Sequence, residues 1–255
     1  MRLSAAQIAL GIVVMYSDQC EFDIRCEWGQ TGVKALAPES DAVIIVDVMS
    51  FSTAVSVAVT KGARVFPYRW RDASTIAFAE SVDAELAGPR GKGRYSLSPR
   101  SLLLLENGSR IVLPSPNGST LSLATGDTPT FAGCLRNARA VAIAARACGP
   151  HISVIACGER WIEDNSLRPA YEDLLGAGAV IANLSGRRSP EASAALAVFQ
   201  SGATQLPDLL EKCSSGRQLI EVGYGADIPL IAELNCDAKA PVLDAGAYVG
   251  ISASG

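Results

Sequence analysis

Short runs of apolar residues alternate with amphipathic segments along most of the chain, and polar turns separate them. The clearest run, residues 42–48, is almost continuously apolar, which is typical of a strand buried on both faces of a parallel sheet. Ser50 and Ser52 follow it as candidate N-caps of a helix. Gly62 is placed to end that helix, and residues 63–68 form the next apolar run. We therefore predict a βαβ unit over this stretch.

The same order of strand, polar turn and helix recurs further along the chain. The additional strands are predicted at residues 110–113, 129–132 and 151–156, and the helices that follow them toward residue 125, at 135–148 and at 168–184. This alternation predicts an α/β protein of three layers, α/β/α, with a mainly parallel or mixed sheet. The C-terminal third reads as mostly helical, over 190–201, 205–213 and 225–235, before a last short strand at 241–243.

Length and loop composition predict a single domain. A chain of 255 residues can bury roughly 70–75 % of its unfolded surface around one core, and we expect one domain over residues 1–255. The stretch 88–99 is rich in Gly and Pro and carries Arg90, Lys92 and Arg94. This basic loop is the best candidate for an internal boundary.

Composition excludes several classes of protein. Hydrophobic residues make up 49 % of the chain and charged residues 19 %, which argues against disorder and for a large interior. The 22 basic and 26 acidic residues give a net charge of −4, and no run of Lys or Arg occurs, so we expect no nucleic-acid partner. No window approaches the roughly 18 consecutive apolar residues of a membrane span, so we expect no membrane partner either.

Cysteines and the N-terminus bear on the compartment. The seven cysteines are odd in number, widely spaced and without a CxxC pair, which favours free thiols in a reducing compartment, the cytoplasm. Residues 8–16 are apolar and follow Arg2, but this stretch is short for a secretory signal, and no small-x-small cleavage site follows it. We favour an amphipathic segment or an upstream start codon. A homodimer is expected only because it is the commonest assembly.

The chain contains one histidine, His151, which excludes any chemistry that needs two. The motifs of several phosphate-binding classes are absent as well. There is no GxxxxGK[ST] loop and no CxxxxxR motif, and Met49 stands where an aspartyl-phosphate enzyme would have a second Asp after Asp47. The groups that remain for catalysis are carboxylates, hydroxyls and helix-start amides.

Polar residues of the predicted turns should meet at one edge, because ligands of open α/β sheets bind beyond the carboxyl ends of the strands. The turns contribute Asp47, Ser50, Ser52 and Thr53, then Asn117, Gly118, Ser119 and Thr120, and then Cys157, Glu159 and Arg160. Hydroxyls and free N–H groups at helix starts can form an anion site, and a glycine lets the chain approach an oxyanion closely. The alternative is that these Ser and Thr residues only cap helices.

Carboxylates in the same region point to a hard metal ion. Asp47 ends a buried strand, where a carboxylate costs free energy unless it is paired, hydrogen-bonded or bound to metal, although it could also be a simple N-cap. Glu172 and Asp173 are adjacent at a predicted helix start, where they could merely favour the helix dipole. With Asp47 and Glu159 they could instead form an oxygen-rich site suited to Mg²⁺.

Several short pieces of the chain, among them VDVMSFSTA at 46–54, SPNGS at 115–119, ACGERW at 156–161 and EDLLGAG at 172–178, occur together in a fixed order. In that order they resemble the 2-phosphosulfolactate phosphatase (ComB) family, from about Tyr16 to the C-terminus. The resemblance implies a Mg²⁺-dependent phosphatase with an α/β fold and a small anionic phosphoester as substrate. It also implies that the site contains Asp47, Asn117, Glu159, Glu172 and Asp173.

The first turn departs from the family pattern. The family has Arg and Ala where this chain has Ser50 and Phe51. A guanidinium binds phosphate or sulfonate through two parallel hydrogen bonds, so its loss is not conservative. Arg136, Arg160 and Arg168 are candidates to replace it.

We expect a Mg²⁺-dependent phosphoric monoester hydrolase that acts on a small phosphorylated acid of the 2-phosphosulfolactate type. The alternative is a non-catalytic phosphate- or organic-anion-binding protein that has kept the pocket. We expect Asp47 to bind the metal together with Glu172 or Asp173, Glu159 to act as general acid or base, and Arg160 to stabilise charge in the transition state. Cys157 is a candidate covalent nucleophile, but a structural role for its thiol is favoured over catalysis. The expected substrate-binding residues are Ser50, Ser52, Thr53, Asn117, Gly118, Ser119 and Thr120.

Overall fold

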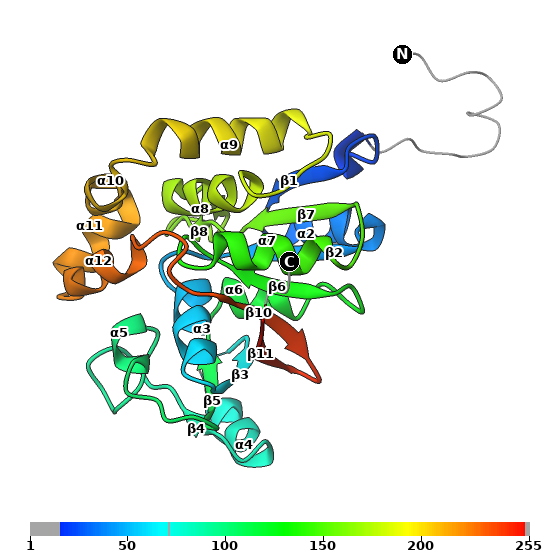
Figure 1. Ribbon diagram of the computed structural model, residues 1–255. Helices are drawn as coiled ribbons and strands as arrows, with labels where there is room; N and C mark the ends of the chain where they lie inside the picture. Colours follow the sequence, from blue (N-terminus) through cyan, green and yellow to red (C-terminus); the bar gives the residue numbers. More distant parts are fainter. Residues whose placement is uncertain (1–15, 71, 253–255) are drawn as a thin grey trace.

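The computed structural model describes residues 16–70 and 72–252, and within them nine strands form one mixed sheet (Figure 1). The stretch 8–16 lies outside these residues, apart from Tyr16. In spatial order the strands are β1 (Ile24–Trp28), β7 (Ile152–Ala156), β2 (Ala42–Val46), β6 (Thr130–Gly133), β10 (Lys239–Asp244), β11 (Ala247–Ser252), β3 (Arg64–Tyr68), β5 (Arg110–Pro114) and β4 (Glu85–Leu86).

The sheet consists of two parallel halves that run in opposite directions. Strands β1, β7, β2 and β6 are parallel to one another, and so are β3, β5 and β4. The hairpin β10–β11 lies between the halves, and each of its pairings, with β6, within itself and with β3, is antiparallel. The predicted βαβ unit over residues 42–68 is therefore wrong. Its apolar runs are strands, but β2 and β3 belong to different halves, and a local pattern carries no information about which strands pair.

Helices cover both faces of the sheet, which confirms the three-layer α/β/α prediction. In the fully buried β2, Val43 and Ile45 pack with α2 (Gly29–Leu36) and α6 (Gly118–Ser122), whereas Ile44 and Val46 face the opposite layer. That layer contains α7 (Ala138–Arg146) and α8 (Tyr171–Ile181), with α9 (Pro190–Gly202) outside α8 (Figure 1). Helix α4 (Ala73–Ser81) covers the same face at β3 and β5.

Helices α3 (Phe51–Thr60) and α6 lie on the same face of the sheet and contact each other. Helix α6 contacts β2, β6 and β3 alike, although β10 and β11 separate β6 from β3 in the sheet. The sheet therefore curves around α6. This curvature brings the turn after β5 close to the turn after β2, even though the two strands run in opposite directions.

The C-terminal third is mostly helical, as predicted, with the helices α9, α10 (Leu206–Lys212), α11 (Ser214–Glu221) and α12 (Ile228–Ile231). The helix predicted at 225–235 is shorter, because a 3-10 turn, η3 (Gly225–Asp227), precedes α12. The strand predicted at 241–243 is the centre of β10, and β11 was not predicted. None of the helices in residues 16–70 and 72–252 has the length and apolar composition needed to cross a membrane.

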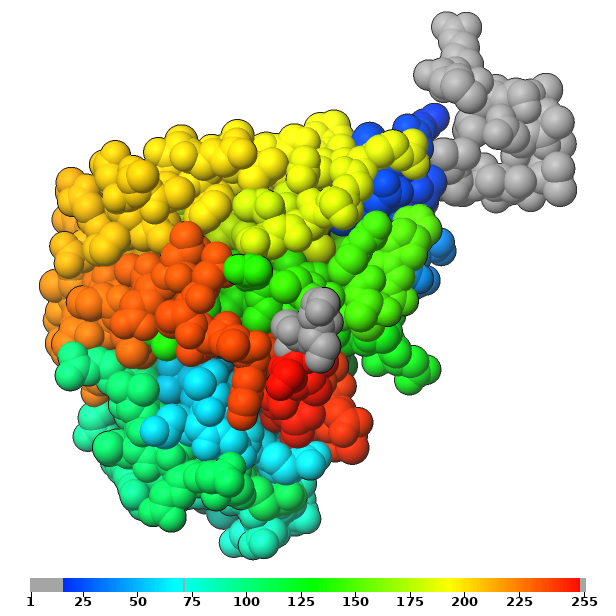
Figure 2. Space-filling view, in the orientation of Figure 1, coloured from blue at the N-terminus to red at the C-terminus, as the bar shows by residue number. Residues whose placement is uncertain are grey.

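The basic stretch 88–99 connects β4 to α5 (Pro99–Leu102) and packs against the C-terminal helices. Ser98 Oγ donates a hydrogen bond to Asp227 Oδ1 at 2.8 Å, and Arg100 Nη1 donates one to the carbonyl of Ala226 at 3.1 Å. Figure 2 shows this teal segment in contact with the orange surface of the C-terminal helices. The end of the loop is thus fixed against η3.

Candidate active site

Asp47 directly follows the last residue of β2, and its carboxylate holds two helix starts together. Its Oδ1 accepts a hydrogen bond from the backbone N–H of Phe51 at 3.0 Å, and its Oδ2 accepts one from Gly118 N–H at 3.0 Å. These are the first residues of α3 and α6. The protein's own carboxylate therefore occupies amides that the sequence suggested for a bound phosphate.

Most of the predicted hydroxyl ligands are engaged in the same local structure. Ser52, Thr53 and Ser119 are fully buried. Their hydroxyls donate to backbone carbonyls, those of Ile45 at 3.0 Å, Val48 at 2.8 Å and Leu113 at 3.0 Å. In these positions the three side chains stabilise the turns after β2 and β5. They cap neither helix, since neither α3 nor α6 has a side-chain hydrogen bond at its N-cap, and their hydroxyl protons are engaged by the backbone rather than directed at a ligand.

A cavity of about 230 Å³, here called the inner cavity, is lined in part by residues of the turns after β2 and β5. The described residues that line it are Asp47, Met49, Ser50, Arg90, Leu97, Ser115, Pro116, Asn117 and Glu159. Of the predicted substrate ligands, only Ser50 and Asn117 are among them; Thr120, like Gly118, is outside the lining. Gly118 has a different function: a Cβ there would lie 2.2 Å from Phe51 Cδ1, so glycine allows α3 and α6 to meet.

Glu159 is the first residue of β8 (Glu159–Arg160) and also lines two further cavities. We call the one lined by Arg160 and Trp161 the outer cavity, and the one lined by Gln218 and Tyr224 the side cavity. Asn117 Nδ2 donates a hydrogen bond to Glu159 Oε2 at 3.1 Å, which links the turns after β5 and β7. Burial, reinforced by the nearby carboxylate of Asp47, raises the pKa of Glu159 to about 7. Burial also raises the pKa of Asp47 to about 6, although its two amide partners oppose the shift.

Asp173, in the first turn of α8, connects the turn after β2 to the turn after β7. Its Oδ1 accepts a hydrogen bond from Val48 N–H and its Oδ2 accepts one from Gly158 N–H, both at 2.8 Å. Burial raises its pKa well above the usual range, and neighbouring Glu172 adds to the shift. Neither acid lines the inner cavity. Within the described part of the chain, no group of three or more Asp, Glu, His or Cys side chains is arranged to hold a metal ion.

Cys157 and Arg160, both predicted for catalysis, lie outside the inner cavity. The Cys157 thiol is buried in a core cluster with Val33 and Leu121, and this burial raises its pKa well above the usual value. A thiolate is the reactive form, so the structure supports a structural thiol rather than a nucleophile. Arg160 is exposed, donates to the carbonyl of Asn165 at 3.4 Å, and lines the outer cavity.

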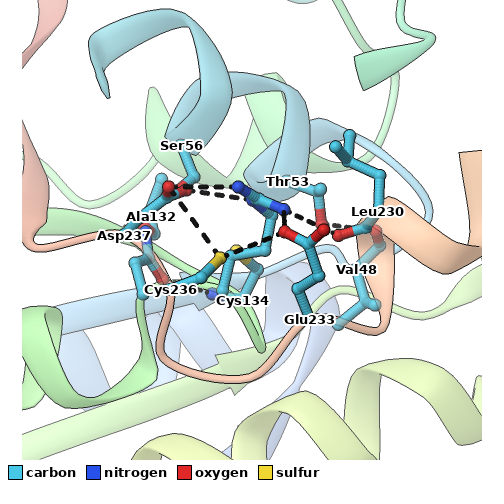
Figure 3. Close-up of polar contacts among 11 residues, drawn as sticks. Val48, Thr53, Ser56, Ala132, Cys134, Leu230, Glu233, Cys236 and Asp237 are labelled. Atoms are coloured by element: carbon cyan, nitrogen blue, oxygen red, sulfur yellow. Dashed lines mark hydrogen bonds and ion pairs between the residues drawn. The ribbon is translucent and has the colours of Figure 1, made fainter. Parts of the chain in front are cut away.

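Two of the arginines considered as replacements at position 50 have other partners. Arg136 forms ion pairs with Asp237, at 3.0 Å, and with Glu233, in a polar cluster that Figure 3 shows together with Ser56 and Cys236. Arg168 lies over the ring of Trp161, its guanidinium carbon 5.9 Å from the ring centroid, and donates to Ser215 Oγ at 3.4 Å.

The arginine that reaches the first turn is Arg90, whose Nη2 donates to Ser50 Oγ at 2.7 Å. The sequence marked Arg90 only as part of a basic loop. The one feature of the sequence that could have pointed to Arg90 is its positive charge in a loop rich in Gly and Pro.

The high pKa of Glu159 predicts a pH-dependent stability in the metal-free protein. Because the folded-state pKa of about 7 exceeds the usual 4.5, the folded state binds this proton more tightly than the unfolded state. The stabilisation is complete below about pH 4.5 and is lost as the pH rises through 7. Urea unfolding in EDTA should show that Glu159→Gln removes about 1–3 kcal/mol of this pH dependence, allowing for partial exposure.

The matched control for this change is Glu163→Gln, because Glu163 is exposed in the segment that follows β8. Its pH dependence should match that of the unsubstituted protein. An identical pH dependence in Glu159→Gln as well would contradict the assignment of the titration to Glu159.

Comparisons with known proteins bear on what this arrangement does. The model of a family described as 2-phosphosulpholactate phosphatase matches residues 33–246, which include all three site turns. A probable 2-phosphosulfolactate phosphatase of Thermus thermophilus is 31 % identical over 216 residues, 80 % of this chain and 88 % of that protein. The 2-phosphosulfolactate phosphatase of Methanothermobacter thermautotrophicus is 27 % identical over 212 residues, 80 % of this chain and 88 % of that protein.

Proposed function

Because this chain belongs to the 2-phosphosulpholactate phosphatase family, we propose that it hydrolyses the phosphate ester of a small acid of the 2-phosphosulfolactate type. Water attacks the phosphorus, the bond from phosphorus to the ester oxygen breaks, and inorganic phosphate and the free hydroxy acid (sulfolactate, from phosphosulfolactate) are released. The observation that carries the proposal is the placement of Asp47, Asn117 and Glu159 together on the wall of the inner cavity.

Glu159 is the residue best suited to move the proton. With a pKa of about 7 it is partly protonated near neutral pH, so it can accept a proton from the attacking water or donate one to the leaving oxygen. Asn117 fixes the orientation of this carboxyl group by its hydrogen bond to Oε2. Asp173 acts as a positioning residue, because it ties the turn that carries Asp47 to the turn that carries Glu159.

We further propose that the reaction uses Mg²⁺, held by Asp47. Mg²⁺ is usually bound by one or two carboxylates, with water and substrate oxygens as its other ligands, and Asp47 is a carboxylate on the wall of the inner cavity. Glu172 and Asp173, the partners expected from the sequence, do not line that cavity. When bound, the ion would supply charge neutralisation at the phosphoryl oxygens.

Phosphate release from a panel of phosphorylated 2-hydroxy acids tests the proposal. We expect hydrolysis in Mg²⁺, loss of at least about 100-fold in EDTA, and recovery on addition of excess Mg²⁺. Activity that persists in EDTA would overturn the metal assignment. Thermal stabilisation by the same acids without turnover would instead support the alternative, a non-catalytic anion-binding protein.

A cytoplasmic location and a homodimeric assembly stay predictions. The seven cysteines are all unpaired, as the sequence predicts. Cell fractionation and light scattering would measure the location and the assembly, respectively.

A further inference from the structure

Arg90 reaches the site from a distant part of the chain. It lies on the loop between β4 and α5, and its Nη2 donates to Ser50 Oγ at 2.7 Å. The guanidinium also lies over the ring of Tyr224, its carbon 5.6 Å from the ring centroid. Ser98 and Arg100 fasten the end of the same loop to η3, as described above. The loop therefore holds the guanidinium in one place rather than presenting it on a free surface chain.

The charge of Arg90 is only partly compensated. Among residues 16–70 and 72–252 no carboxylate lies within ion-pair distance of it, and its Nε is buried without a hydrogen-bond partner. Asp227 contributes the strongest attraction among the nearby charges, ahead of Asp47, but its own Oδ2 is also buried and unpartnered. Removing a guanidinium from water without a paired anion costs free energy, so this arrangement is suited to an anion supplied from outside.

The position of Arg90 indicates which anion. Arg90 lines both the inner cavity and the side cavity of about 460 Å³, where Ser215, Gln218, Tyr224 and the carboxyl group of Glu159 are further polar lining residues. Arg90 is the one cation among the described residues that line the side cavity. The inner cavity, by contrast, holds Asp47 and Asn117, the groups assigned above to the phosphoryl centre.

We propose that Arg90 and the side cavity bind the non-reacting acid group of the substrate, a carboxylate or a sulfonate, while its phosphoryl group occupies the inner cavity. This inference rests on the proposed function. It makes Arg90 a specificity-determining residue: phosphoesters with a second acid group are preferred over esters of neutral alcohols. Ser50 holds the guanidinium at the junction of the two cavities.

A substrate-pair comparison tests the role of Arg90. Values of kcat/KM are measured for a phosphorylated 2-hydroxy acid and for a phosphate ester of a neutral alcohol of similar size. Arg90→Gln should lower the ratio of the two values by about 10- to 100-fold, mainly through KM for the acid, because one charge-assisted contact is lost. Arg94→Gln is the matched control, since Arg94 is exposed on the same loop and lies over its neighbour Tyr95. The control should keep the ratio.

An equal loss for both substrates would overturn the proposal, because it would mean that Arg90 binds the phosphoryl group or only supports the loop with Asp227. A second measurement separates this failure from a failure of the proposed function. Calorimetric binding of sulfolactate, which carries no phosphate, is measured in EDTA to the unsubstituted protein and to Arg90→Gln. We expect at least 10-fold weaker binding to the variant. Equal affinities would overturn the subsite, whether or not any ester is hydrolysed.

Discussion

Replacing Asp47 by Asn should reduce Mg²⁺-dependent phosphate release by at least about 100-fold, because the change removes the proposed metal ligand. Both carboxylate oxygens already accept a backbone N–H, from Phe51 and from Gly118. An Asn side chain has one oxygen, so its amide nitrogen would face one of these two donors. We therefore also expect a loss of about 1–3 kcal/mol in the free energy of unfolding.

The two effects are separated by measuring phosphate release over a range of Mg²⁺ concentrations and urea unfolding on the same preparation. Asp208→Asn is the control, since Asp208 is exposed and pairs with the exposed Lys212 one helical turn away. It should change activity little and stability by less than about 0.5 kcal/mol. Full activity of Asp47→Asn in Mg²⁺ would rule out metal binding by Asp47.

Gly118→Ala is expected to damage both the fold and the site, because the new Cβ would lie 2.2 Å from Phe51 Cδ1 and 2.8 Å from Phe51 Cβ. Phe51 is fully buried and stacks edge to face on Tyr248, so its ring has no open space to enter. Overpacking of this kind typically costs about 1–3 kcal/mol. Any shift of α6 would also lengthen the bond from Gly118 N–H to Asp47, so activity should fall with stability.

A double-mutant cycle identifies the cause of the loss. Phe51→Leu makes room beside position 118, so Gly118→Ala should cost at least about 0.5 kcal/mol less in that background than in the unsubstituted protein. Urea unfolding of the four proteins measures this coupling. Equal costs in the two backgrounds would show that contact with Phe51 is not the reason for glycine.

Local pattern predicted the elements of the fold better than their pairing. The apolar run at 42–46 is a strand buried on both faces, as its composition indicates, and the helix after it begins within the predicted turn. The direction of β3 relative to β2 could not be predicted, because it depends on a hairpin at residues 239–252 that inserts between the two halves.

Of the carboxylates that the sequence suggested for the candidate site, Asp47 and Glu159 line the inner cavity and Glu172 and Asp173 do not, while Arg90 was not suggested at all. Asp47, Asn117 and Glu159 each follow a strand or begin the turn after one, which is where the sequence places them. Arg90 follows no such rule: it is 40 residues from Ser50 in the chain, and only the packing of its loop on the C-terminal helices brings the two together. Ser52 and Thr53 show the opposite problem, since a hydroxyl that donates to a nearby backbone carbonyl and a phosphate-binding hydroxyl have the same local sequence.

The hairpin β10–β11 also has a consequence for synthesis on the ribosome. It lies in the middle of the sheet, yet it follows all the other strands in chain order. Nascent chains emerge at about 5–20 residues per second with the N-terminal part first, so both half-sheets are complete before the strands that join them exist. During that interval the edges of β6 and β3 that later pair with Val242 and Tyr248 are open to other chains. The emerging protein therefore depends on its last-made strands to close its own aggregation-prone edges.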